Sequence, residues 1–467
     1  MTIPLWRKEA LALHKDFMQG ICTPTDALLS CLDRIDEVQP RINAYTVLRK
    51  EAALAEAEAS TKRYEVGSPL SCLDGVPLSV KDNLLTADMP TTWGSPGLAD
   101  YCPGTEELAV RLMRQAGAIV VGKTNVPEFT LEGYTDNALF GATRNPWNTD
   151  LTPGGSSGGA AASVAAGCTP LALGTDGGGS IRRPAAHCGL VGFKPSLGAI
   201  ARTDGLPALL LDFEVVGLMS RSVADIKAMF TTAGGAHQAD TSSLAAQAAR
   251  SRPTACHPLR VLYVASLDNS PVDPEIASQC EHAVQQLVIL GHEVQVGDLP
   301  LDLAPVNADW PMVSQIGLDL MFAEHPEWGD AASAKYRDMA RRGAERPSRE
   351  LWRTLERVAQ LRRDCVTLFA QWDVIVTPTT AAMPWPAREA YPTQIANQDV
   401  GPRGHAVFTG WVNAAGLPGV SLPIGQSGAG LPIGLHLVTR YGGDDLLLNL
   451  ASVCETQLGW HAGWPEI

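Results

Sequence analysis

Three consecutive glycines precede a serine in the segment GTDGGGSIR, residues 174–182. Glycine has no side chain and accepts a positive φ, so the N–H groups of such a run can converge on one point and bind an anion. Ser180 follows directly, which would place its hydroxyl beside the same donors. A nucleophile next to an oxyanion-binding loop is what acyl transfer requires. An isolated GGGS motif, however, is more often a turn with a capping serine.

A second glycine-serine loop strengthens the catalytic interpretation. The segment PGGSSGG at 153–159 carries Ser156 and Ser157 and leads into the small apolar run 160–166. Such a run is typical of a helix packed closely against a sheet. The two loops therefore frame one helix and one strand, and we expect them to face each other across a site.

A serine nucleophile needs a group that accepts its proton. Lys81 follows the apolar run 75–80, so it projects from a strand end into buried surroundings. Burial disfavours the ammonium and lowers its pKa, which makes a lysine a base near neutral pH. From the residues alone, a surface lysine at a strand end is an equally good interpretation. His187 lies nearby in sequence, but nothing connects it to Ser180, and a structural role is the better interpretation.

Two further motifs match catalytic patterns only formally. GGSSG at 154–158 fits the G-x-S-x-G nucleophile elbow, but Thr152 and Pro153 precede it where a buried strand should enter the turn. Residues 117–124 fit the phosphate-binding pattern G-x-x-x-x-G-K-T, but their interior is a strand-forming run and Pro127 interrupts the expected helix. A nucleotide-binding P-loop protein is therefore a remote alternative.

The elements that position these residues alternate between strands and helices. Short apolar runs predict strands at 76–80, 118–121, 259–264, 292–296 and 373–379. Helical periodicity predicts helices within 5–60, 105–115 and 274–290. Residues 233–258 are poor in large apolar side chains and predict a surface excursion. This alternation predicts an α/β fold.

Composition restricts the class of protein and its partners. The net charge is −14, from 36 Lys and Arg against 50 Asp and Glu, so we expect neither nucleic acid nor a membrane as a partner. The first residues lack the apolar core of a secretory signal, and no segment has the length of apolar residues that a membrane span needs, so a cytoplasmic location is expected. The ten cysteines form no C-x-x-C pair, and no metal site is evident.

The motifs together resemble those of the amidase signature family. The similar stretches are GVPLSVKDN (75–83), VGKTNVPEF (121–129), FGATRNPWN (140–148), PGGSSGG (153–159), PLALGTDGGGSIRRPAAHCGLVGFKP (170–195), DVIVTPT (373–379) and NAAGLPGVSLPIGQSGAGLPIGLHLV (413–438). They cover most of residues 70–230 and 370–455.

The resemblance implies a Ser-Ser-Lys triad of Lys81, Ser156 and Ser180. Ser180 would attack the substrate carbonyl. Ser156, preceded by a cis peptide bond in the family, would relay the proton between Ser180 and a neutral Lys81. No cofactor is implied.

The resemblance also implies roles for residues around the triad. The amides of Gly177, Gly178, Gly179 and Ser180 would form the oxyanion hole, although most members have threonine or another side chain where this chain has Gly177. Thr130, Ser157 and Arg183 would border the substrate or support the triad, and Asp176 would support it as well. For Arg183 two roles stay open, because in some relatives an arginine three places after the nucleophile binds a substrate carboxylate and more often it is structural.

The family fold is a single α/β domain with a mixed, twisted central β-sheet covered by α-helices on both faces. We therefore expect one domain over 1–467, divided into a helical cover (1–65), a catalytic core (70–230), a variable substrate-side region (230–370) and the C-terminal part of the core (370–455).

The expected activity is hydrolysis of amides through an acyl-enzyme, with esters and carbamates as further candidate substrates. Six of the eleven tryptophans lie within 310–411. If they line the site they favour neutral apolar or aryl substrates, although packing of a large core explains them equally well. The main alternative is an amidotransferase-type subunit that releases ammonia from glutamine or asparagine for a partner. The expected partner is a small-molecule amide, and a homodimer is also considered.

Overall fold

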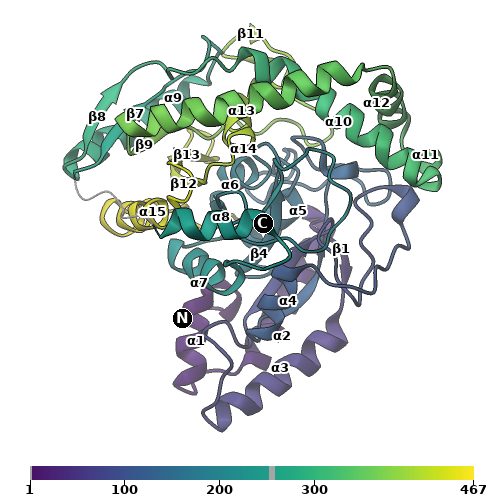
Figure 1. The fold of residues 1–467 in the computed structure, drawn as a ribbon. Helices are drawn as coiled ribbons and strands as arrows, with labels where there is room; N and C mark the ends of the chain where they lie inside the picture. Colours follow the sequence, from purple (N-terminus) through teal and green to yellow (C-terminus); the bar gives the residue numbers. More distant parts are fainter. Residues whose placement is uncertain (1–2, 252–257) are drawn as a thin grey trace.

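One large β-sheet runs through the computed structural model, which describes residues 3–251 and 258–467 (Figure 1). Its strands, in spatial order, are β1 (Tyr45–Leu48), β3 (Ile119–Thr124), β2 (Pro77–Lys81), β4 (Leu171–Asp176), β6 (Val215–Ser220), β5 (Val191–Lys194), β12 (Gly419–Gln426), β13 (Pro432–Val438), β9 (Val374–Pro378), β7 (Arg260–Tyr263) and β8 (Glu293–Val296). Strand β2 pairs in parallel with β3 and β4, and β7 pairs in parallel with β8 and β9, whereas the strands between these groups pair antiparallel. The predicted α/β fold with a mixed sheet is confirmed.

Helices cover both faces of this sheet. One face packs against α1 (Ala10–Met18), α4 (Leu108–Gln115), α7 (Val223–Ala233), α8 (Thr241–Arg250), α9 (Pro274–Ile289) and α15 (Asp444–Leu458). The other packs against α2 (Pro24–Ile42), α3 (Lys50–Glu65), α5 (Gly158–Ala166), α6 (Arg182–Cys188), α10 (Ala304–Glu324), α13 (Ser348–Gln371) and α14 (Gly410–Ala414). The short α11 (Pro326–Ala331) and α12 (Ala334–Ala344) pack on α10, and β10 (Gln394–Ile395) pairs only with β11 (Gln398–Asp399).

The alternation of side chains along each strand decides which face they join. In β3, Val120 packs with the α4 side, whereas Ile119 and Val121 pack with α2 and α3. Successive side chains of a strand point to opposite faces, so a continuous apolar run fits a sheet that is covered on both sides. This is why the predicted strands read as unbroken apolar runs.

Two parts of the chain differ from the sequence prediction. The predicted helical region 5–60 contains the strand β1, whose four residues pair antiparallel with β3 at the sheet edge. The predicted surface excursion 233–258 contains α8, which buries Ala246 and Ala249. Its small apolar residues suffice for close packing, so the lack of large side chains was misleading. Residues 252–257 of that excursion lie outside the described residues.

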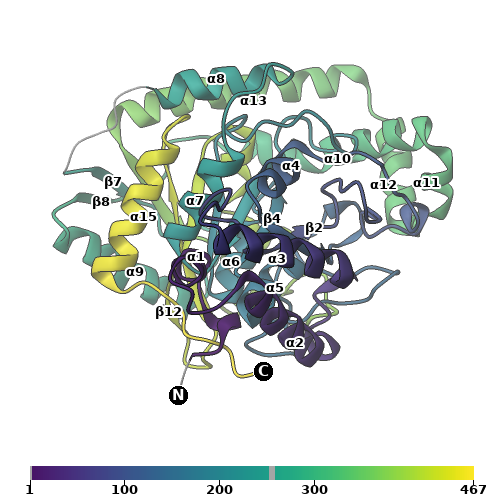
Figure 2. The same ribbon diagram turned by 90° about the horizontal axis from the view of Figure 1, so that it is seen from below.

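The two ends of the described chain lie close together when the molecule is viewed from below (Figure 2). Trp6 and Trp464 meet edge to face with ring centroids 5.3 Å apart. In the part of the chain that the structure describes, no helix has the length and apolar character needed to cross a bilayer.

Candidate active site

The register of two parallel strands places the candidate catalytic residues at one edge of the sheet. Leu78 of β2 lies opposite Leu171 of β4, and Val80 opposite Leu173. The carboxyl ends of parallel strands point to the same edge. Lys81 is the last residue of β2, and β4 leads directly into the glycine run before Ser180.

Lys81 is fully buried and contacts three oxygen atoms. Its Nζ lies 2.8 Å from Ser156 Oγ, 2.8 Å from Thr175 Oγ1 and 3.2 Å from the Thr175 carbonyl oxygen. Burial lowers the pKa of Lys81 to about 7, against the opposing effects of Glu214 and Asp176. A large part of the lysine is therefore neutral at pH 7.

The surroundings of a neutral Lys81 fix the direction of its lone pair. An uncharged amine has two N–H groups and one lone pair. Thr175 offers two acceptors, its hydroxyl and its carbonyl oxygen. When both N–H groups donate to Thr175, the lone pair faces the third contact, the hydroxyl of Ser156. Lys81 is thereby arranged to accept a proton from Ser156.

The loop that carries Ser156 is joined to both β4 and the Ser180 loop. The peptide bond between Gly155 and Ser156 is cis, as the family resemblance implies. Ser157 donates through its hydroxyl to the Thr175 carbonyl oxygen at 3.1 Å, and its amide donates to the Ser180 carbonyl oxygen at 3.2 Å. Ser157 is fully buried and lines neither of the two cavities described below, so its contacts are those of a residue that supports the triad.

The three glycines before Ser180 each make room for a different neighbour. A Cβ on Gly177 would lie 2.7 Å from Leu210 Cδ1, one on Gly178 would lie 3.0 Å from Trp310 Cζ2, and one on Gly179 would lie 2.2 Å from Thr409 Oγ1. Gly179 also has a φ of 118°, which disfavours other residues. The bare backbone is therefore required at Gly179, both by close packing and by conformation, whereas the end of the flexible Leu210 side chain could move to admit a Cβ at Gly177.

Asp176 holds the glycine loop in shape. Its carboxylate accepts from the amides of Gly179 at 2.6 Å and Ile181 at 3.1 Å, and from the guanidinium of Arg182 at 2.9 and 3.0 Å. Burial alone would raise the pKa of Asp176, but the charge of Arg182 outweighs it and holds this pKa well below its usual range. Asp176 is thus an anion that orders the loop.

The donors of the predicted oxyanion hole are not equivalent. The Gly179 amide is already engaged by Asp176. Within residues 3–251 and 258–467, no acceptor is found for the amides of Gly177, Gly178 and Ser180. These three amides are therefore the remaining candidates for an oxyanion hole, and of the three residues Gly178 and Ser180 line the larger cavity described next.

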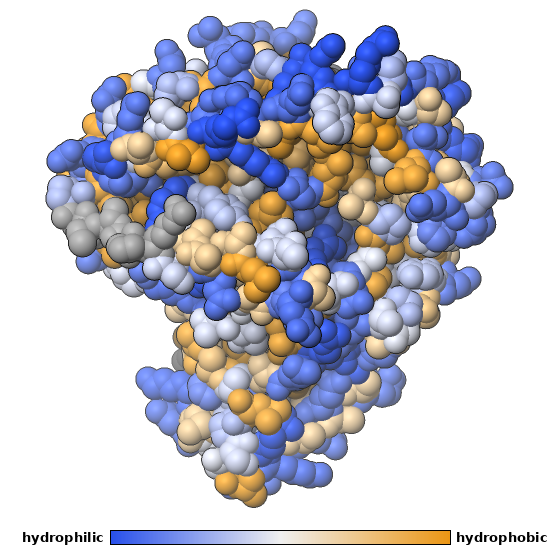
Figure 3. All heavy atoms as spheres, viewed as in Figure 1, coloured by the Kyte–Doolittle hydropathy of each residue, from blue (hydrophilic) through white to orange (hydrophobic). Residues whose placement is uncertain are grey.

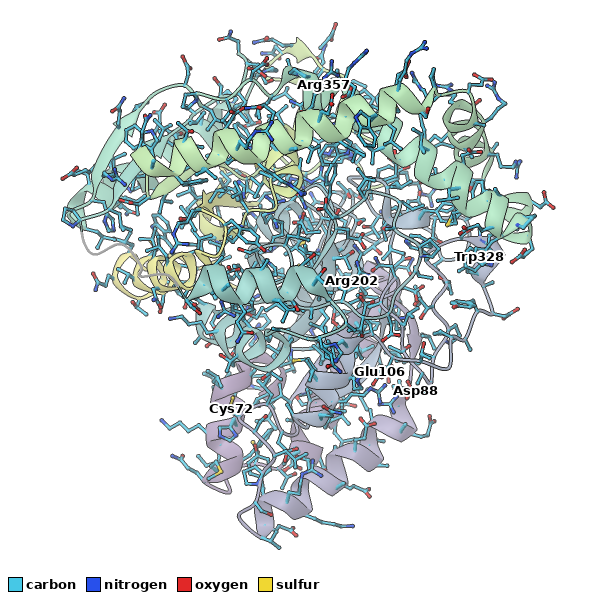
Figure 4. All side chains as sticks on the ribbon, viewed as in Figure 1. Cys72, Asp88, Glu106, Arg202, Trp328 and Arg357 are labelled. Atoms are coloured by element: carbon cyan, nitrogen blue, oxygen red, sulfur yellow. The ribbon has the colours of Figure 1, made fainter. Side chains whose placement is uncertain are left out.

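Ser180 lines a cavity of about 840 Å³. Its walls come from the 130–133 loop, Gly178 and Arg183, from α10 and α12, and from residues 390–407. A second cavity of about 430 Å³ adjoins it and includes Asn83, Arg202 and Glu214. Arg202, near the middle of the face in Figure 4, donates to Glu214 and Glu107. Thr130 lines both cavities.

Arg183 links the two serine loops through hydrogen bonds to a carbonyl oxygen of each. Its Nε donates to the Gly179 carbonyl oxygen at 3.3 Å, its Nη2 to the Gly155 carbonyl oxygen at 3.5 Å, and its Nη1 contacts His405 Nε2 at 3.3 Å. Burial lowers the pKa of Arg183 to about 10, so it is a cation at neutral pH. Two of these partners are backbone carbonyl oxygens of the two serine loops, and the third is the His405 side chain.

The competing motifs have structural roles. Lys123, the lysine of the P-loop pattern, lies inside β3, where its Nζ donates to the Leu84 carbonyl oxygen and Thr91 Oγ1, both at 2.8 Å. The nucleotide-binding interpretation is therefore wrong. His187 lies 3.3 Å from the Ala382 carbonyl oxygen, and burial lowers its pKa to about 4. In the described part of the chain no group of His, Cys, Asp and Glu could hold a metal ion.

Sequence reasoning missed several residues of the site. Thr175 and Asn83 stand inside the quoted motifs, so their polar side chains beside Lys81 were the available signal. Arg403 of the larger cavity lies in a loop that offered none. Of the six tryptophans at 310–411, Trp310 alone among the described residues lines this cavity, which weakens the sequence argument for neutral apolar substrates.

Comparisons with known proteins give matches over nearly the whole chain. The family model described as "Amidase" matches residues 26–448. A glutamyl-tRNA(Gln) amidotransferase subunit of Picosynechococcus sp. is 32% identical over 487 residues, covering 97% of this chain and 99% of the relative. A bacterial aryl acylamidase of the amidase signature family superposes with a TM-score of 0.88 at 26% identity, covering 98% of both chains. A 6-aminohexanoate cyclic dimer hydrolase gives 0.86 at 30% identity, covering 100% of this chain and 99% of the other.

Proposed function

Because the chain belongs to the amidase family of enzymes, which act on carbon–nitrogen bonds, we propose that it hydrolyses linear amides through an acyl-enzyme on Ser180. The observation that carries the proposal is the contact of 2.8 Å between Lys81 Nζ and Ser156 Oγ, with Thr175 accepting both N–H groups of the neutral amine. This arrangement supplies a base for a serine relay, and the glycine loop supplies the oxyanion donors.

Acylation begins when Ser180 Oγ attacks the amide carbonyl carbon. In this proposal Ser156 takes the proton of Ser180, and the Ser156 proton passes to Lys81 Nζ across their 2.8 Å contact. The carbonyl oxygen becomes an oxyanion held by the amides of Gly177, Gly178 and Ser180. The tetrahedral intermediate then collapses, the C–N bond breaks, and the leaving amine takes the proton back from Lys81 through Ser156.

Deacylation repeats these transfers with water as the nucleophile. Water loses a proton through Ser156 to Lys81 and attacks the ester, and Ser180 is released as the proton returns. Each half-reaction uses Lys81 first as a base and then as an acid. Its pKa of about 7 suits both tasks at neutral pH.

Active-site labelling tests this proposal directly. A fluorophosphonate should modify the wild-type protein, and mass spectrometry of the peptides should place the adduct on Ser180. Ser180→Ala should lose turnover of anilides and the adduct while keeping its circular dichroism spectrum and thermal midpoint. Labelling of the Ser180→Ala protein at another serine, or retained turnover, would exclude Ser180 as the nucleophile.

A second candidate is suggested by the names of the curated relatives. Several of them, including the Picosynechococcus protein above, are amidotransferase subunits that are 32–36% identical over 93–97% of the chain. In such a role the chain would release ammonia from glutamine for a partner. Stable co-purification of a partner protein, with glutamine hydrolysis exceeding anilide hydrolysis, would favour this candidate over a free-standing amidase.

A further inference from the structure

The larger cavity has a charge opposite to that of the whole chain. The chain carries −14, yet the ionised side chains that line the cavity are Glu132, Arg183, Lys335 and Arg403. Glu132 pairs with Lys335. Among the described residues that line the cavity, the two arginines are left without a carboxylate partner. Fixed charge in a walled cavity selects ligands of the opposite sign.

The two arginines differ in what they contact. Arg183 is occupied by the carbonyl oxygens of Gly155 and Gly179 and by His405. Arg403, in contrast, has no hydrogen-bond acceptor and no carboxylate partner among the residues that the structure describes. Burial lowers its pKa to about 10, which still leaves a cation at neutral pH. Arg403 is half-buried, and its guanidinium nitrogens are not among the atoms sealed off from solvent, so an anion that enters the cavity can pair with them.

Trp310 holds Arg403 close to the reaction centre. The Arg403 guanidinium carbon lies 4.6 Å from the centroid of the Trp310 ring, within the range of a cation–π contact. The same ring lies 3.0 Å from the position of a Cβ on Gly178, next to the amides of the predicted oxyanion hole. A single indole ring thus separates the unpaired cation from the oxyanion loop.

The helix that carries Trp310 is fixed in place from outside. Asp309 accepts two bonds of 2.8 Å from Arg357 of α13, which is labelled near the top of Figure 4, and also accepts from Thr354 at 2.9 Å. Hydrophobic residues gather beneath α13 on the surface shown in Figure 3. The Trp310–Arg403 pair is therefore a preformed wall of the cavity.

We propose that the cavity selects amides that carry a carboxylate, with Arg403 binding the carboxylate and Trp310 supporting the apolar body of the substrate. The inference rests on the proposed amide hydrolysis and names its substrate class. An aryl or alkyl body packs on the indole, while the carboxylate supplies the missing partner of Arg403. Arg183 is already satisfied by the serine loops, so specificity is assigned to Arg403 instead.

Matched substrate pairs test this assignment. One pair is succinic acid mono-p-nitroanilide and butyric p-nitroanilide, which differ in an acyl-side carboxylate. The other is 4-acetamidobenzoate and 4-methylacetanilide, which differ on the amine side. The wild-type enzyme should favour the carboxylate of at least one pair by about tenfold or more in kcat/KM, the usual strength of a hydrogen bond to a charged group. Equal kcat/KM values within both pairs would overturn the inference.

Substitution of Arg403 tests the named residue. Arg403→Gln should bring the ratio of kcat/KM within the favoured pair close to one, and Arg403→Lys should keep part of it. The matched control is Arg341→Gln, which removes the same charge from an exposed position on α12. A ratio that falls equally in Arg341→Gln, or that persists in Arg403→Gln, would contradict a specific role for Arg403.

Binding to the Ser180→Ala protein separates this inference from the proposed function. Calorimetry should show, for at least one of the two pairs, tighter binding of the carboxylate compound than of its neutral counterpart. If that holds but no amide is hydrolysed by the wild type, amide hydrolysis is wrong and the carboxylate site stands. If neutral amides are hydrolysed and carboxylates neither bind nor react better, the hydrolysis stands and the carboxylate site is wrong.

Discussion

Thr175 presents both its hydroxyl and its carbonyl oxygen to Lys81 Nζ, at 2.8 and 3.2 Å. The same hydroxyl accepts from Asn83 Nδ2 at 3.0 Å and lies 3.3 Å from Glu214 Oε2. One threonine therefore orients the base and connects it to the smaller cavity. The direction of the Lys81 lone pair depends on this residue.

Replacing Thr175 should separate the orientation of Lys81 from its burial. Thr175→Val has almost the same shape but lacks the acceptor, so kcat/KM for amides should fall by about tenfold or more as the lone pair loses its fixed direction. Thr175→Ser keeps the hydroxyl and should retain most activity. Steady-state kinetics on one anilide measure both variants, and equal losses in the two would argue against the hydroxyl.

The pH dependence of the wild-type enzyme should follow Lys81. Because burial lowers the pKa of Lys81 to about 7, the lysine is protonated and inactive as a base below that pH and neutral above it. The kcat/KM for a neutral anilide should therefore rise with pH, pass half its maximum near pH 7 and then level off. A profile that is flat between pH 5 and about 9 would exclude a titrating base in this range.

Glu214 should control where this rise occurs. Its negative charge raises the pKa of Lys81, whereas Arg202 lowers it. Glu214→Gln removes the first effect and leaves the second, so the midpoint of the kcat/KM profile should move to lower pH by roughly half a unit to one unit. Glu345→Gln, an exposed position next to α12, is the control and should leave the midpoint in place.

Loss of the base should affect amides more than activated esters. Lys81→Ala should lower kcat/KM for an anilide by about 10²–10⁴, because the leaving amine needs the proton that Lys81 returns. A p-nitrophenyl ester of the same acid has a leaving group that needs no proton, so its loss should be smaller. Equal losses on the matched pair would contradict the relay, and inactivation by a chelator would indicate a metal.

Gly179→Ala should damage both folding and catalysis. The added Cβ would lie 2.2 Å from Thr409 Oγ1, at a φ of 118°. Displacement of the loop should abolish turnover and cost ~1–3 kcal/mol in urea denaturation. Gly430→Ala is a matched control, since Gly430 has a φ of 76° but no atom within 4 Å of its Cβ position. It should lose only ~1 kcal/mol and stay active.

Much of the chemistry was predictable because local sequence encodes it. The apolar run before Lys81 indicated a buried strand end, and β2 indeed buries all five of its residues. The glycines before Ser180 indicated a close approach, which Trp310 and Thr409 make. The resemblance to a known family added the cis peptide bond before Ser156, which the structure has.

The unpredicted features all depend on contacts between distant segments. Strand β1 is defined by pairing with β3, about 75 residues later in the chain. Arg403 lies over Trp310, which is 93 positions earlier in the chain, and no periodic pattern in the sequence indicates such a contact. Helix α8 was missed because its buried face consists of small residues. Local patterns identify elements and strand ends, but not which loops meet above them.

The links that Ser157 and Arg183 make between the two serine loops separate reactivity from substrate range. These links hold the loops of Ser156 and Ser180 together, whereas α10, α12 and residues 390–407 form cavity walls that the proposed substrate would contact. Amino-acid substitutions in these walls can change which acyl or amine group of a substrate fits the cavity, while the two serines keep their positions. The fold thus offers a constant reaction centre beside a surface on which new substrates can be accommodated.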